Sequence, residues 1–174
     1  IRDAKKRGVK VTCETCPHYF TLTEKACEGY NTLAKVSPPL RNEDDIDAII
    51  KGLQDGTIDI IATDHAPHHE DEKNVEFDRA ANGMIGFETA LPLAYTSLVK
   101  TGKLTMPELV LKMCKNPADI LNIDKGRLVH GKMADITVFD PNDSYIIDIK
   151  KMVSKSKNSP FHGWPVTGRV TTTI

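Results

Sequence analysis

The sequence predicts an α/β fold: part of a parallel α/β barrel, followed by part of a small β-domain. The apolar run Ile58–Thr63 has the character of a buried strand and ends at the charged residue Asp64. Parallel barrels present functional groups in this way, at the carboxyl ends of their strands. Amphipathic helical patterns surround this run, whereas from Gly126 onward short β-rich segments replace them. These observations place barrel segments at residues 1–125 and β-domain segments at 126–174.

The bulk composition is that of an ordinary globular domain and excludes several functional classes. The chain has 174 residues, of which 40% are hydrophobic and 27% charged. A net charge of −1 gives no basic surface for nucleic acid or membrane. No apolar run approaches the roughly 18 residues that cross a bilayer. We expect a cytoplasmic protein without a leader segment.

The first third of the chain predicts a strand and two helices. Residues 9–15 are rich in β-branched side chains and lie between Gly8 and Pro17, which indicates a strand. A short helix is expected over residues 21–27, followed by a loop over 28–40. Residues 43–54 carry a helical apolar stripe behind a capping Asn42.

The middle of the chain predicts a long loop and further helices. Residues 65–86 are polar and without periodicity, and a connection of about twenty residues is usually functional or disordered. Because this loop follows the end of a strand, we expect it to line the active site. Helices are predicted over 87–100, over 107–115 behind a capping Thr105, and over 117–121.

The sequence of the last part of the chain predicts strands. The predicted strands cover residues 127–132, 134–139, 145–149 and 166–173. The run 158–164 ends in Trp164, which we expect to pack between the two parts of the chain.

A Cys-x-x-Cys pair, Cys13 and Cys16, raises the possibility of a zinc or redox site. In a strand these two side chains point to opposite faces, and no second such pair completes a four-sulfur site. We therefore interpret them as packed thiols in a reducing compartment.

Asp64 has two interpretations. At the mouth of a barrel, a carboxylate can bind a metal ion, act as a general base, or do both. Alternatively, an aspartate before a turn can cap the loop that follows it. The first interpretation is favoured, because the preceding face of Ile58, Ile60 and Ala62 is apolar and ends in this charge.

The histidines leave alternatives open. His65, His68 and His69 follow Asp64, and such a tract either binds zinc or forms a solvated loop. Their spacing lets one of them at most face the pocket. His18 could be a ligand, or it could bond to backbone near the strand end.

Polar residues on neighbouring loops are further candidates. Ser37 could donate a hydrogen bond into the pocket, and Arg41 could pair with a carboxylate or with an acidic helix start. The turn dipeptide Asn82-Gly83 could bring backbone N–H groups close to a ligand.

The segment Ala62-Thr63-Asp64-His65-Ala66-Pro67-His68 resembles the signature of dihydroorotases, in the cyclic-amidohydrolase branch of the amidohydrolase superfamily. Four more segments resemble that family in order along the chain: residues 14–19, 35–41, 86–92 and 134–140. Hydantoinases and allantoinases share versions of the first two of these four. The resemblance is greatest to the bacterial dihydroorotases that are separate enzymes of pyrimidine synthesis.

This resemblance implies a metal-dependent (β/α)8 barrel with two zinc ions and a β-sandwich. It implies reversible closure of carbamoyl-aspartate to dihydroorotate, with Asp64 as the catalytic residue and a zinc ligand. By the same resemblance His68, Asn82 and Gly83 bind substrate, and His18 is not a metal ligand. Ser37 falls where dihydroorotases usually carry a substrate-binding asparagine, and this departure puts that contact in doubt. The family also implies a homodimer, with or without aspartate carbamoyltransferase as a partner.

The remaining zinc ligands of the family pattern lie upstream of residue 1, and Ile1–Gly8 reads as the end of a helix. We therefore expect a C-terminal part of a longer enzyme, inactive by itself, with the last two barrel strands. Two alternatives remain: an allantoinase or hydantoinase-like cyclic amidase, and a non-catalytic dihydroorotase-like partner subunit.

Overall fold

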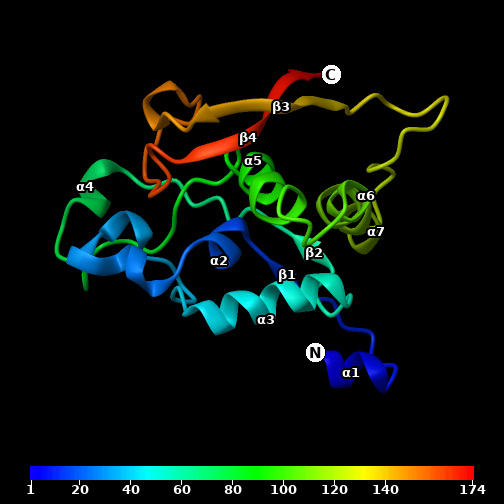
Figure 1. The fold of residues 1–174 in the computed structure, drawn as a ribbon, viewed down its shortest axis with the longest axis horizontal. Coiled ribbons are helices and arrows are strands. Elements are labelled where there is room, and N and C mark those ends of the chain that lie inside the picture. Colours follow the sequence, from blue (N-terminus) through cyan, green and yellow to red (C-terminus); the bar gives the residue numbers. More distant parts are fainter.

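Two small sheets organise the chain in the computed structural model, which describes residues 1–174 (Figure 1). Strands β1 (Glu14–Thr15) and β2 (Ile60–Ile61) form a parallel pair. Strands β3 (Thr137–Ile146) and β4 (Pro165–Thr173) form an antiparallel ribbon. Helices lie around the parallel pair, and the ribbon lies over one of them, α5 (Ala90–Ala94).

The parallel pairing of β1 with β2 agrees with the prediction of adjacent barrel strands. Glu14 lies opposite Ile60 and Thr15 opposite Ile61. The strands are shorter than the predicted ranges 9–15 and 58–63. Backbone bonds continue a little further, since the carbonyl of Cys13 accepts from Asp59 and Ile60 and that of Thr15 from Ala62.

The segment after β1 differs from the helix predicted over residues 21–27. Pro17, expected only to bound the strand, begins helix α2 (Pro17–Thr21), and a proline fits the first helical turn because no N–H is needed there. The helix predicted over 21–27 is replaced by the 3₁₀ segment η1 (Glu24–Tyr30), and η2 (Thr32–Ala34) follows. At the start of the chain, α1 (Arg2–Lys6) agrees with the helical reading of that end.

Helix α3 (Glu43–Gln54) is confirmed at its predicted bounds. The Asn42 side chain accepts a hydrogen bond from the Asp45 N–H at 3.0 Å, as an N-cap should. Its apolar stripe, including Ile46 and Leu53, is buried.

The predicted loop 65–86 contains one regular element that was not predicted, helix α4 (Glu70–Lys73). The helix predicted over 87–100 begins later, as α5, and continues into the π-helical segment η3 (Tyr95–Val99). Phe87, expected on its apolar face, is 69% exposed and stacks on the ring of His65 instead.

The next helices agree with the prediction. Thr105 caps α6 (Met106–Val110), and the π-helical segment η4 (Leu111–Lys115) and α7 (Asn116–Ile120) continue it.

The β-rich part is simpler than predicted. Residues 127–132 form no strand, because they lie exposed without a partner strand. β3 runs through Asp140-Pro141-Asn142, which lie between the separate strands predicted over 134–139 and 145–149, since a shift in register between Asp140 and Ser144 absorbs the extra residues. It ends at Ile146, and the short 3₁₀ segment η5 (Ile149–Lys151) follows. The strand predicted over 166–173 is confirmed as β4.

Two hydrophobic clusters hold these elements together. The first joins α2, α3, β2, η3 and α6 through residues such as Phe20, Leu53 and Ile61. The second joins the loops after β1 to the β-rich part through Phe161 and Val166, with Trp164 packed against it. Trp164 thus lies where the two parts meet, as expected, and the division at residue 125 stays a prediction. No helix is long and apolar enough to cross a membrane.

Replacing Leu53 with alanine should lower the free energy of unfolding by about 2–5 kcal/mol, because a cavity would replace a side chain that is 1% exposed. Urea unfolding followed by circular dichroism measures this change. The matched control is Val153→Ala at a position 91% exposed, which should stay within about 0.5 kcal/mol of wild type. Equal effects of both substitutions would contradict the assignment of the first cluster as core.

Candidate functional site

Asp64 lies just beyond the end of β2 in a left-handed backbone conformation, with φ 47°. Aspartate tolerates this conformation better than most residues. Its side chain is exposed. The loop that follows is capped by other groups: His69 and Glu72 form a capping box on α4, and His65 Nδ1 accepts a bond from the Gly86 N–H at 2.9 Å. These bonds favour the site interpretation of Asp64 over the capping one.

The parallel pairing of β1 and β2 brings Asp64 close to two residues that follow β1. The ligand atoms of Cys16, His18 and Asp64 all lie within 4.8 Å of one another. Cys16 and His18 are buried, whereas Asp64 is open to solvent. The structure thus groups the carboxylate with one thiol and one imidazole at a single strand-end edge.

Burial keeps both neighbours of Asp64 uncharged. It lowers the pKa of His18 to about 4, and the nearby Asp64 charge opposes this shift only in part. It also raises the pKa of the Cys16 thiol to about 12, with the charges of Asp64 and Glu14 adding to the effect. His18 Nε2 is buried without a hydrogen-bond partner, so the predicted alternative of a backbone bond is not what this nitrogen makes.

Sulfur, nitrogen and carboxylate donors are the set that zinc prefers, so the cluster is compatible with a metal ion. Binding through Cys16 would require loss of its thiol proton, because the thiolate is the ligand. Asp64 is the only exposed residue of this cluster.

The histidines of the tract separate into different roles. The His65 ring is held between the Gly86 N–H and a stacked Phe87, with ring centroids 3.9 Å apart. His69 caps α4. His68 Nε2 lies 2.9 Å from the carbonyl oxygen of Asn82. His68 is therefore the tract residue that contacts the second candidate segment, Asn82-Gly83.

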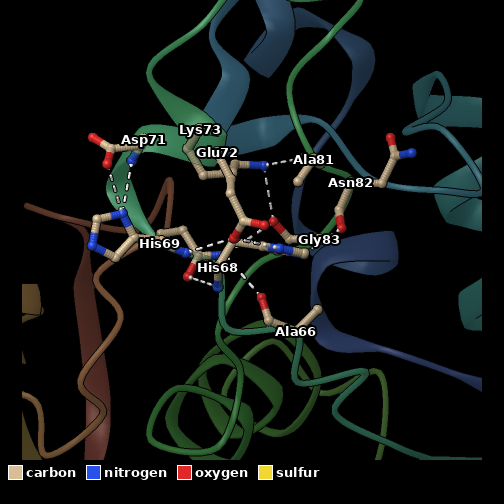
Figure 2. A network of polar contacts seen from close by, with 10 residues as sticks. Ala66, His68, His69, Asp71, Glu72, Lys73, Ala81, Asn82 and Gly83 are labelled. Carbon is tan, nitrogen blue, oxygen red and sulfur yellow. Dashed lines mark hydrogen bonds and ion pairs between the residues drawn. The ribbon is translucent and has the colours of Figure 1, made fainter.

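Figure 2 shows the network around His68 and that segment. Gly83 has φ 123°, and a Cβ there would lie 2.5 Å from the Cβ of Ala66, so only glycine fits. Its N–H donates to Lys35 O at 2.9 Å, and its carbonyl accepts from Lys73 Nζ at 3.0 Å and Asn158 Nδ2 at 3.2 Å. With both backbone groups of Gly83 bonded, Asn82 is the residue that this segment exposes.

Three side chains that support this network were not among the candidates: Lys35, Lys73 and Asn158. Burial, followed by the charge of Lys35, lowers the pKa of Lys73 to about 8. In the sequence, Lys73 ends an acidic run that reads as a solvated face, so no local signal marks it. Ser37 is exposed and lies outside the network, and Arg41 pairs with Asp45 of the acidic helix start at 3.4 Å.

Comparison with known proteins identifies the family to which this chain is related. The model of the amidohydrolase family matches residues 2–174. Proteins named dihydroorotase from Acetivibrio thermocellus and Ruminiclostridium cellulolyticum are 66% and 64% identical over 174 residues. The match covers 100% of this chain and 41% of each relative, so the chain spans less than half of their length.

Solved structures show the same relationship. An L-hydantoinase (dihydropyrimidinase) from Arthrobacter aurescens superimposes with a TM-score of 0.94 at 34% identity, covering 100% of this chain and 40% of that one. A dihydropyrimidinase from Brevibacillus agri gives 0.91 at 25% identity, covering 99% and 40%. The resemblance to dihydroorotases and the expected α/β fold, part of an amidohydrolase barrel, are confirmed. From the match over nearly its whole length, the chain belongs to the amidohydrolase family.

Proposed function

We propose that the chain is the C-terminal part of a zinc-dependent cyclic amidohydrolase of the dihydroorotase type. Its reaction would interconvert carbamoyl-aspartate and dihydroorotate in cytoplasmic pyrimidine biosynthesis. The observation that carries this proposal is the exposed Asp64 carboxylate at the end of β2, within 4.8 Å of His18 and Cys16. The 66% identity to a protein named dihydroorotase supports the choice of substrate.

The candidate residues of this chain would have separate roles in the reaction. Zinc, when bound, would supply an activated water at neutral pH, because a metal ion lowers the pKa of its water toward about 7. Asp64 would hold one metal ion and would accept the proton of the attacking water and pass it to the ring nitrogen that leaves. His68 and the segment Asn82-Gly83 would orient the substrate. Within this segment Asn82 is exposed, whereas both backbone groups of Gly83 are bonded to other residues of the chain.

The chain should need the rest of the enzyme for activity. It spans 41% of its dihydroorotase relatives, and its single parallel pair of strands cannot close a barrel. The remaining zinc ligands would come from outside these residues. A homodimer, with or without aspartate carbamoyltransferase, belongs to the same proposal and rests on the resemblance.

A second candidate is a hydantoinase or allantoinase-like cyclic amidase. The TM-score of 0.94 to an L-hydantoinase favours it, and so does Ser37 in place of the usual asparagine of dihydroorotases. The non-catalytic alternative is less well supported, because a purely structural subunit has no physical need for the motif residues Asp64 and His68.

In the full-length enzyme, Asp64→Asn should reduce turnover of dihydroorotate by about 10²–10⁴-fold, since the amide cannot accept the proton. Steady-state kinetics measures the loss of turnover. Zinc analysis measures the weaker binding of the metal ion that Asp64 would hold. Asp143→Asn is the matched control: this carboxylate pairs with Arg169 on β4, and its loss should leave turnover unchanged. Near-wild-type turnover in Asp64→Asn would refute the mechanism.

The substrate assignment predicts that kcat/KM for dihydroorotate exceeds that for hydantoin and allantoin by about tenfold or more, because the site would hydrogen-bond groups those rings lack. Parallel assays of one enzyme preparation measure the three values. A preference for hydantoin or allantoin would transfer the assignment to the second candidate. Ser37→Asn should then raise the dihydroorotate value selectively, since the amide offers both a donor and an acceptor.

A further inference from the structure

Helix α4 lies directly beside the residues to which the proposed function gives substrate contacts (Figure 2). We propose that α4 is the positioning element of the substrate-binding edge: Lys73 fixes the backbone on both sides of Asn82, and Glu72 fixes the ring of His68. This inference rests on the proposed function for the identity of the substrate. Its structural part stands on contacts within this chain.

Lys73 is a buried cation bound by backbone oxygens. It is 3% exposed, and its ammonium donates to Ala81 O at 2.7 Å and Gly83 O at 3.0 Å. Burying an ammonium group is costly unless hydrogen bonds compensate it, and bonds from a charged donor are the stronger kind. The position therefore requires a long donor that reaches both carbonyls from α4.

The two carbonyls that Lys73 binds belong to the residues on either side of Asn82. The Ala81 N–H also donates to Glu72 O at 3.0 Å, so α4 holds this segment through its backbone as well. Between the two anchors, Asn82 keeps its carbonyl 2.9 Å from His68 Nε2. The position of the exposed Asn82 thus follows from the position of Lys73.

Glu72 acts on the other side of the His68 ring. Its carboxylate oxygen Oε2 lies 3.4 Å from His68 Nδ1 and accepts the His69 N–H at 2.9 Å. Both ring nitrogens of His68 therefore face oxygen acceptors, one from Glu72 and one from Asn82. Two contacts on opposite sides of the ring fix its rotation. The Glu72 side chain is 56% exposed, so we expect a modest effect that acts on orientation.

The chain offers a matched control for Lys73. Lys112 is also buried, at 7% exposure, and its ammonium donates to a backbone carbonyl, Ile58 O, at 2.7 Å. That carbonyl precedes β2 and lies outside the His68 network. Lys73→Met and Lys112→Met each remove one buried ammonium group and keep an unbranched side chain. A merely structural role for Lys73 would give the two variants the same phenotype.

In the full-length enzyme, both methionine variants should lower the melting temperature, and both should keep the zinc content of wild type. Lys73→Met alone should raise KM for dihydroorotate by about tenfold or more, because small misplacements of binding groups cost that much. Lys73→Arg, which keeps the charge and the donors, should recover part of the loss. Equal KM values for the two methionine variants would overturn the inference.

Glu72 has its own control in Glu108. Both are the third residue of a capped helix, in capping boxes with His69 and Thr105. Glu72→Gln should raise KM by about threefold, as expected for a half-exposed pair, while Glu108→Gln leaves KM unchanged. An identical KM in both variants would remove Glu72 from the proposal.

Amide hydrogen exchange separates this inference from the proposed function, because it needs no substrate. Lys73→Met should speed exchange in residues 80–85 by about tenfold relative to wild type, whereas Lys112→Met should not change it. Unchanged exchange in this segment of Lys73→Met would overturn the positioning role. An inactive wild-type enzyme with the expected exchange would overturn only the proposed function.

Discussion

The structure depends on the parallel pairing of β1 with β2. Because parallel strands end at the same edge, this pairing puts the residues after Thr15 beside those after Ile61. Cys16 and His18 on one side and Asp64 on the other come together for that reason, although nearly fifty residues separate them. The first hydrophobic cluster supports the pairing by packing α3 and η3 against Ile58 and Ile61. Proposed catalysis at Asp64 thus depends on a short ladder whose position is set by the core behind it.

Lysines whose ammonium groups donate to backbone carbonyls are a second feature that recurs in the chain: Lys73 and Lys112 are buried and Lys35 is half-buried. Lys35, Lys73 and Lys112 each donate to backbone carbonyls, and the first two hold the loop that carries Asn82. A lysine can reach a carbonyl several residues away while its stem contributes apolar packing. A loop with little regular structure can therefore be rigid. This explains how an irregular connection between β2 and α5 can present backbone groups with defined geometry.

Local signals in the sequence predicted the elements whose stability is local. α3 has its cap, acidic first turn and apolar stripe within one segment, and its predicted bounds are those observed. Helix α2 was not predicted, because a proline after a strand can simply end the strand or can begin a helix. Residues 127–132 have strand-forming composition but no partner strand in this structure, and a strand requires one.

The sequence by itself determined the family resemblance, the expected role of Asp64 and the choice of His68 from its tract, since these follow from residue type and order. The tertiary structure alone decided what surrounds them: the unpartnered His18 Nε2 near Asp64, and the contacts of Lys73 with Ala81 and Gly83. The physical reason is that burial and hydrogen-bond partners depend on distant segments brought together by packing. A lysine in an acidic run looks solvated until the fold places two carbonyl oxygens around its ammonium group.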